Sequence, residues 1–294
     1  MVEPFCDAVD CNPLMSDFLM LTKFRLTLLV LCTTAAGYYL AIEGKFDGVH
    51  FGLTLMGTAL LAGGASALNQ VLEVREDTAM SRTRTRPLAA ERRSVLWGQG
   101  WGVMMALGGM CLLLWWVNPL TAALGAVTLA IYAFIYTPLK KRTELNTLVG
   151  AVPGAIPPVM GWTAVREDWD WEAGVLFAVL FLWQLPHFLA IAWLCREDYQ
   201  AAGFKMIGAD GDASRLGRQA TGYAAALWPV SLLYGLSGKI GVWSIVVSFV
   251  LGAGLVWRAL VFWRRGGEKS AKGLFWGSIL YLPVLLLVWC LGKT

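Results

Sequence analysis

The sequence predicts an all-α membrane protein with about nine transmembrane helices. Of its 294 residues, 57% are hydrophobic and only 15% are charged, whereas a typical soluble domain has about 25% charged residues. Several uncharged stretches are long enough to cross a bilayer, which takes about 20 apolar residues. Because lipid offers the backbone no hydrogen-bond partners, spans of this hydrophobicity are expected to be helices rather than strands.

The predicted spans follow one another with short polar loops between them. The first two lie at 26–42 and 51–72. The 46 residues from Ser94 to Leu139 carry no charge, which is too long for one span, and the Asn118-Pro119 pair supplies a turn between two helices. Five further spans are predicted at 145–165, 173–195, 219–238, 240–257 and 273–292.

The distribution of Lys and Arg predicts the orientation of the bundle. With the N-terminus in the cytoplasm, 20 of the 24 Lys and Arg residues fall in cytoplasmic segments, as the positive-inside rule requires. The opposite side keeps only Lys45, Arg166, Lys239 and Lys293. We therefore expect a C-terminus outside, and the net charge of +4 reflects this bias rather than a nucleic-acid surface.

The same reasoning divides the chain into a cytoplasmic tail, residues 1–23, and a single transmembrane domain, residues 24–294. The tail contains four acidic residues and no Arg, unlike an Arg-rich transit peptide, and it lacks the pattern of a cleavable signal. These features favour a bacterial inner, or cytoplasmic, membrane.

The loop after the second span concentrates polar groups. Asn69, Glu73 and Asp77 are spaced by four residues, so on a helix each lies about 40° around and about 6 Å along from the last. Three oxygen donors then share one face, as a Mg²⁺ site with a bound phosphate requires. Glu76 falls on this face too, either as a ligand or as a partner of a neighbouring Arg.

Downstream of these acids, Arg82 and Arg86 are suited to grip phosphate oxygens. For the arginines alone, the positive-inside rule is an equally good explanation.

A second polar loop follows the sixth span, and Asp198 is its best candidate for a metal ligand. The two loops occupy matching places, after the second and the sixth helix. We therefore predict two four-helix pseudo-repeats followed by a ninth helix. The metal site is expected where the two loops face each other.

His187 lies well inside a predicted span, where an ionisable group is by default functional. A neutral His hydrogen-bonded between helices is the alternative. Trp183 lies one turn earlier; it is a weaker candidate, because the chain has 15 Trp and membrane proteins place Trp at their interfaces for anchoring alone.

Three motifs carry a family resemblance: the acid and Arg loop from Asn69 to Leu88, the run Tyr136 to Thr143 with Asn146-Thr147, and Trp183 to Phe188. Together, from about Lys23 to Met206, they resemble the protohaem IX farnesyltransferases, or haem O synthases. These belong to the UbiA-type intramembrane prenyltransferases. Glu73 stands where the family more often has Asp.

The resemblance implies a UbiA-type helical bundle that converts farnesyl diphosphate and haem B into haem O for haem-copper terminal oxidases. It implies Mg²⁺ held by Asn69, Glu73, Asp77 and Asp198, with Arg82, Arg86 and Lys140 on the diphosphate. His187 and Trp183 would contact haem. Haem A synthase or oxidase assembly proteins would be partners.

Three rival functions stay open at this point. A related prenyltransferase acting on a quinone precursor or a chlorophyll-type acceptor would use the same loops but would not need His187. A transporter would also have broken spans and a pseudo-repeat, but it predicts charges at mid-membrane, and apart from His187 the spans have none. A non-catalytic haem-binding assembly protein would leave Asn69, Glu73 and Asp77 without a role.

Overall fold

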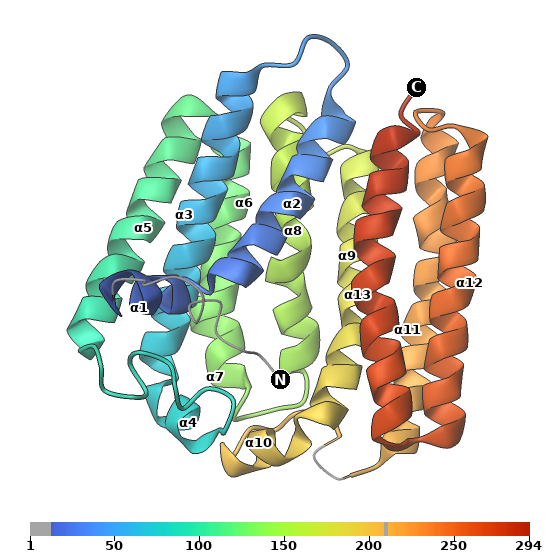
Figure 1. The fold of residues 1–294 in the computed structure, drawn as a ribbon. Coiled ribbons are helices and arrows are strands. Elements are labelled where there is room, and N and C mark those ends of the chain that lie inside the picture. Colours follow the sequence, from blue (N-terminus) through green and yellow to red (C-terminus); the bar gives the residue numbers. More distant parts are fainter. Residues whose placement is uncertain (1–12, 209–210) are drawn as a thin grey trace.

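The computed structural model describes residues 13–208 and 211–294, and in this part of the chain the regular structure is helical, with one isolated bridge between Ile240 and Lys293. The long helices run side by side, and α1 lies across them near one end (Figure 1). The helices are α1 (Pro13–Leu21), α2 (Phe24–Ala41), α3 (Gly48–Leu72), α4 (Val74–Ala79), α5 (Val95–Trp116), α6 (Pro119–Ala130), α7 (Thr137–Leu139), α8 (Asn146–Arg166), α9 (Trp171–Leu194), α10 (Arg196–Ala201), α11 (Ala213–Leu233), α12 (Val242–Arg265) and α13 (Gly267–Leu291).

The prediction of about nine spans agrees with this structure. Eight of the described helices are long and apolar enough to cross a membrane. The remaining long helix, α11, carries Arg215 and Arg218 in its first two turns, which lower its hydropathy, but it packs along α9 and α12 like the others. The break predicted at Asn118-Pro119 is the start of α6, where the Asn118 side chain caps Thr121 N–H. The chain is a multi-pass membrane protein.

The helices approach closely where small residues face each other. A Cβ added to Gly109 on α5 would lie 2.7 Å from the Gly57 carbonyl oxygen of α3. Gly37 on α2 meets the backbone of Pro158 on α8 in the same way. Small residues at such contacts are how helices associate in lipid, where apolar burial between helices gains little.

Backbone geometry supports the predicted pseudo-repeat. Glu73 joins α3 to the six-residue helix α4 with φ −111° and ψ 16°, and Cys195 joins α9 to the six-residue helix α10 with φ −110° and ψ 18°. The second helix of each half therefore ends in the same bend and a short continuation. Counted from these joints, Asp198 corresponds to Glu76, and Tyr199 to Asp77.

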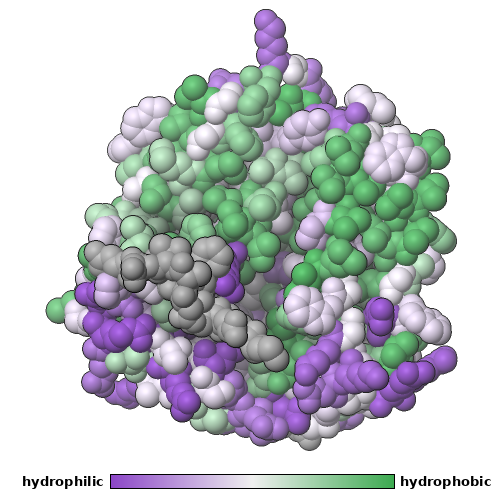
Figure 2. Space-filling view, in the orientation of Figure 1, coloured by the Kyte–Doolittle hydropathy of each residue, from purple (hydrophilic) through white to green (hydrophobic). Residues whose placement is uncertain are grey.

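The two ends of the bundle differ in polarity. In the orientation of Figure 2, apolar side chains dominate the middle and upper part of the surface, and hydrophilic side chains gather at the lower end. That end carries α4, α7 and α10 (Figure 1). At the opposite end, Lys239 pairs with Glu43 and Glu172 at 3.1 and 2.9 Å, which ties the first half of the chain to the second.

Candidate active site

The candidate site lies at the hydrophilic end, where α3 continues into α4. Asn69 on the last turn of α3, Glu73 at the joint and Asp77 on α4 are 1%, 4% and 1% exposed. The spacing by four residues does place them together, as predicted. Buried carboxylates must be compensated by charge and hydrogen bonds, so their partners define what the site can hold.

A cation from a different segment contacts each of these side chains. Lys23 Nζ donates to Asn69 Oδ1 at 2.7 Å. Lys140 Nζ lies 2.7 Å from Glu73 Oε1. Arg86 donates to both oxygens of Asp77 at 2.8 and 2.7 Å. When Lys23 is protonated, three cations face two carboxylates and an amide, which leaves one excess positive charge.

Lys23 was not among the predicted site residues, because its charge is also explained by the positive-inside rule. It lies between α1 and α2 in the left-handed backbone region, with φ 48° and ψ 52°, an uncommon conformation for a residue other than Gly. Shielding from water, together with the positive charges of Arg86 and Lys140, lowers the pKa of Lys23 to about 7. A nearby anion would therefore stabilise its protonated form.

A π-helical turn, η1 (Ile131–Tyr136), completes the polar wall between α6 and α7. Tyr132 OH accepts a hydrogen bond from Lys23 at 3.2 Å, and the Tyr136 ring centre lies 4.6 Å from Lys140 Nζ. Thr137 Oγ1 accepts from Asn69 Nδ2 at 3.0 Å, which turns Asn69 Oδ1 toward Lys23. Single π-turns within α-helices are frequent at functional sites.

The two polar loops face each other, but Asp198 is not gathered with the other predicted ligands. Its Oδ1 accepts from Ser81 N at 3.1 Å and from Ser81 Oγ at 2.8 Å. In residues 13–208 and 211–294, no three His, Cys, Asp or Glu side chains lie close enough to hold a metal ion. The physical reason is the joint geometry, which puts Tyr199, rather than Asp198, at the position equivalent to Asp77.

The remaining predicted residues of this end have distinct places. Glu76 forms an ion pair with Lys141, so it is the partner of a Lys rather than of a neighbouring Arg. Arg82 is exposed. Its charge acts on Tyr199, whose pKa is nevertheless raised to about 12 by burial. Tyr199 packs with Met80 and Phe204 between the two loops.

His187 and Trp183 meet on α9, seven residues or more before its end, about 10 Å along the helix. The His187 ring stacks against Trp183 and against Phe275, with centroids 5.3 and 5.1 Å away and interplanar angles of 15° and 20°. Ser278 Oγ lies 2.9 Å from His187 Nδ1. Phe275 and Ser278 belong to α13, where the sequence offered only general hydropathy.

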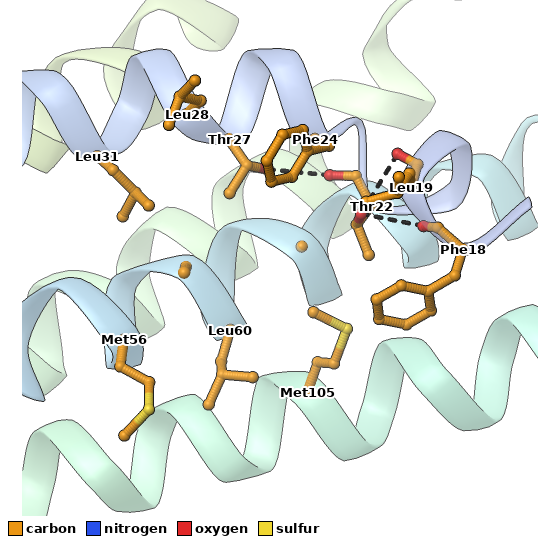
Figure 3. Close-up of a pocket in the computed structure, with 12 residues that line it drawn as sticks. Phe18, Leu19, Thr22, Phe24, Thr27, Leu28, Leu31, Met56, Leu60 and Met105 are labelled. Atoms are coloured by element: carbon orange, nitrogen blue, oxygen red, sulfur yellow. Dashed lines mark hydrogen bonds between the residues drawn. The ribbon is translucent and has the colours of Figure 1, made fainter. Parts of the chain in front are cut away.

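Two apolar cavities lie beside α3. The larger, of about 280 Å³, is lined by residues of α1, α2, α3 and α5 (Figure 3). Thr22 and Phe24, on either side of Lys23, help to line it. Three of its four α3 residues, among them Leu60 and Gly63, lie more than 100° around the helix from Asn69, so most of this cavity lies on a different side of α3 from the polar array.

The smaller cavity, of about 30 Å³, has room for roughly one water molecule. It is lined by Ala62 and Ala65 on the side of α3 that also carries Asn69, and by residues of α2, α6 and α8. An apolar chain that starts at the polar array and runs into the bundle would follow this side of α3.

The donor set fits Mg²⁺ in the company of an anion. Asn69, Glu73 and Asp77 supply the oxygen atoms that hard cations prefer. The three cations beside them match a polyanion, because a bare metal ion would add to an existing excess of positive charge. A diphosphate bound together with Mg²⁺ would match both the oxygen donors and the three cations.

Comparison with known proteins was made by sequence and by fold. The model of the UbiA prenyltransferase family matches residues 30–280. The chain is 40% identical to "Protoheme IX farnesyltransferase" of Solibacter usitatus, covering 92% of this chain and 96% of that one. It is 42% identical to the protein of the same name from Anaeromyxobacter, covering 94% and 93%.

Solved structures show the same fold at low sequence identity. A digeranylgeranylglyceryl phosphate synthase structure matches with a TM-score of 0.81 at 12% identity, covering 95% of this chain and 98% of that one. A UbiA homologue from Archaeoglobus fulgidus, bound to DMAPP and Mg²⁺, matches with a TM-score of 0.70 at 14% identity, covering 92% and 98%.

Proposed function

This chain belongs to the UbiA prenyltransferase family, and from that premise we propose that it transfers the farnesyl group of farnesyl diphosphate to a vinyl group of haem B, giving haem O. The observation that carries the proposal is the buried array of Asn69, Glu73 and Asp77, each held by a cation. Relatives that are about 40% identical over more than 90% of this chain share the name protoheme IX farnesyltransferase, which supports haem as the acceptor.

The cations of the array bind the diphosphate. Lys23, Lys140 and Arg86 are already within hydrogen-bond distance of the predicted metal ligands. A diphosphate at the same place is therefore within reach of all three, and charge-assisted hydrogen bonds to phosphate are among the stronger ones in proteins. Arg82 follows α4 on the same loop as Arg86 and is exposed, so it can approach the diphosphate from the water.

Asn69, Glu73 and Asp77 would hold Mg²⁺, and Asp198 is the candidate from the second loop. When bound, Mg²⁺ would neutralise negative charge on the leaving diphosphate. Lys140 and Arg86 hold the Glu73 and Asp77 side chains in place, because each buried carboxylate is paired with one of these cations. Asn69 is oriented by Thr137.

The reaction breaks the allylic C–O bond of farnesyl diphosphate, and the electron pair leaves with the diphosphate. The haem vinyl group supplies the electron pair of the new C–C bond to the farnesyl carbon. Water then adds to the electron-deficient vinyl carbon and loses a proton, which gives a hydroxyethylfarnesyl group. The apolar bundle around α3 excludes water that would otherwise capture the allylic cation.

His187 and Trp183 bind the haem acceptor in this proposal. Their stacked rings lie on α9 within the membrane, and Phe275 of α13 stacks against His187. An imidazole inside a span is costly unless it has a partner or a function. A prenyltransferase for quinone precursors has no use for an iron ligand there.

We also propose that the hydrophilic end faces the cytoplasm of a bacterium, in its inner membrane, with the C-terminus outside. The positive-inside distribution supports this orientation. Haem A synthase or oxidase assembly proteins are the proposed partners, because haem O is a substrate for the next enzyme of haem-copper oxidase maturation.

The test is to incubate the purified protein in detergent with haem B, farnesyl diphosphate and Mg²⁺, and to identify products by chromatography and mass spectrometry. We expect farnesylated haem, and its loss in EDTA followed by recovery with added Mg²⁺. If farnesyl diphosphate is consumed only when an aromatic quinone precursor is present, the acceptor is that precursor and not haem. Haem binding without any product would favour an assembly protein.

A further inference from the structure

The hydroxyl group of Ser278 on α13 contacts the imidazole of His187 on α9. Ser278 is fully buried on α13. Its Oγ donates to the Phe275 carbonyl oxygen at 2.7 Å, and a serine hydroxyl has a single proton to donate. Both contacts can be hydrogen bonds at once only if Oγ accepts from Nδ1–H, at 2.9 Å, and this arrangement has the hydrogen on Nδ1.

A neutral imidazole has one N–H, so the lone pair of His187 lies on Nε2. In the part of the chain that the structure describes, no hydrogen bond engages Nε2, and the His187 side chain is only half-buried. An unprotonated Nε2 with accessible surface is the form of histidine that binds a metal ion.

The ring is also held against rotation. Trp183 and Phe275 both stack against it. Trp183 Nε1 donates to the Ser278 carbonyl oxygen at 2.7 Å. Ser278 thus contacts His187 through its hydroxyl group and Trp183 through its backbone, so one residue of α13 fixes both side chains of α9.

We propose that Ser278 is a positioning residue, which holds His187 in the Nδ1–H tautomer and so presents Nε2 as an axial ligand to the iron of the haem substrate. The inference rests on the proposed function, because it takes haem as the acceptor. When one ring nitrogen of a histidine binds a metal, a hydrogen bond donated by the N–H of the other ring nitrogen orients the ring and strengthens it as a ligand.

Binding and vibrational measurements on the full-length protein in detergent test this proposal. Haem B is titrated by Soret absorbance, and the iron–histidine stretch of the ferrous complex is recorded by resonance Raman spectroscopy. Ser278→Ala should weaken haem binding by about 10-fold or more and lower the stretching frequency. Ser278→Thr, which keeps a hydroxyl group, should retain the wild-type frequency.

Ser248 on α12 offers a matched control. It is 1% exposed, its Oγ donates to the Ser244 carbonyl oxygen at 2.7 Å, and it accepts from Trp289 Nε1 at 3.1 Å. Ser248→Ala removes the same kind of hydroxyl group without touching His187, so haem affinity and frequency should stay at wild-type values.

The proposal is overturned if Ser278→Ala keeps the wild-type affinity and frequency, or if a folded Ser278→Thr behaves like Ser278→Ala. It is also overturned if His187→Ala leaves the haem spectrum unchanged. These readouts need no turnover. Failure of the proposed function would appear instead as a wild-type protein that binds haem with a histidine signature and forms no farnesylated product.

Discussion

Asn69, Glu73 and Asp77 are held by three cations from segments far apart in the chain: Lys23 before α2, Lys140 after α7 and Arg86 after α4. The array is polar, buried and rich in charge, which is unfavourable for stability alone, because each charge must be desolvated. Such an arrangement is expected where a charged ligand is bound.

Asp77→Asn tests the metal and diphosphate role at the residue scale. The amide keeps the size of the side chain but removes the charge that faces Arg86. We expect a loss of turnover of roughly 100-fold or more, as for other groups that stabilise developing charge, with haem affinity unchanged. Product formation and Soret titration measure the two effects.

Glu76→Gln is the control for that variant, since Glu76 pairs with Lys141 outside the array. Its turnover should stay within about threefold of wild type, because the partner Lys141 is 53% exposed and an ion pair screened by water contributes little. Equal losses in Asp77→Asn and Glu76→Gln would contradict a specific role for Asp77.

Lys23→Met tests the cation that the sequence did not single out. Methionine preserves much of the length and apolar stem of lysine but cannot bind phosphate. A hydrogen bond to a charged group contributes about 1.5–3 kcal/mol, so the KM for farnesyl diphosphate should rise about 10-fold or more. Steady-state kinetics measure it, and Lys45→Met, a change in the loop between α2 and α3, should leave KM unchanged.

At the scale of elements, helix contacts through small residues position α3, and with it the array. Gly109 on α5 faces the backbone of Gly57, whereas Gly100 on the same helix has nothing within 4 Å of an added Cβ. Replacing Gly by Ala at these two positions therefore distinguishes the effect of helix packing on stability from the effect of intrinsic helix propensity.

Gly109→Ala should lower the thermal midpoint in detergent, because overpacking costs typically about 1–3 kcal/mol. Gly100→Ala should leave the midpoint unchanged or raise it, because Ala is the better helix former by up to about 1 kcal/mol. A scan of thermal unfolding compares them directly. A Gly109→Ala protein as stable as Gly100→Ala would show that α3 and α5 can separate without loss.

The short helices α4 and α10 show how far the pseudo-repeat extends. Both follow a joint with nearly the same backbone angles, at Glu73 and Cys195, so the two halves share their geometry at the site. Their side chains differ, because the second half has Tyr199 where the first has Asp77. The halves are therefore similar in shape and unequal in chemistry.

At the scale of the whole molecule, the charges of the two ends predict which side of the membrane each end faces. A Cys introduced at Lys45 or at Arg142, in a variant without its six native Cys, can be labelled with a membrane-impermeant thiol reagent. Lys45→Cys should react in intact cells, and Arg142→Cys only after permeabilisation. The reverse pattern would place the active site outside.

The sequence by itself determined the helical class, the order of the spans, the two polar loops and the shared face of Asn69, Glu73 and Asp77. These features follow from hydropathy and from helical periodicity, which are local properties of the chain. The motif resemblance added the family, which the comparisons confirmed.

Only the tertiary structure decided which groups meet across the bundle. Lys23 and Asn69 are 46 residues apart, His187 and Ser278 are 91 apart, and Ser81 and Asp198 are 117 apart. Periodicity along one helix fixes which face a residue lies on, but not which helix covers that face. Close packing of the helices brings these pairs together, and it leaves Asp198 on Ser81 rather than beside Asp77.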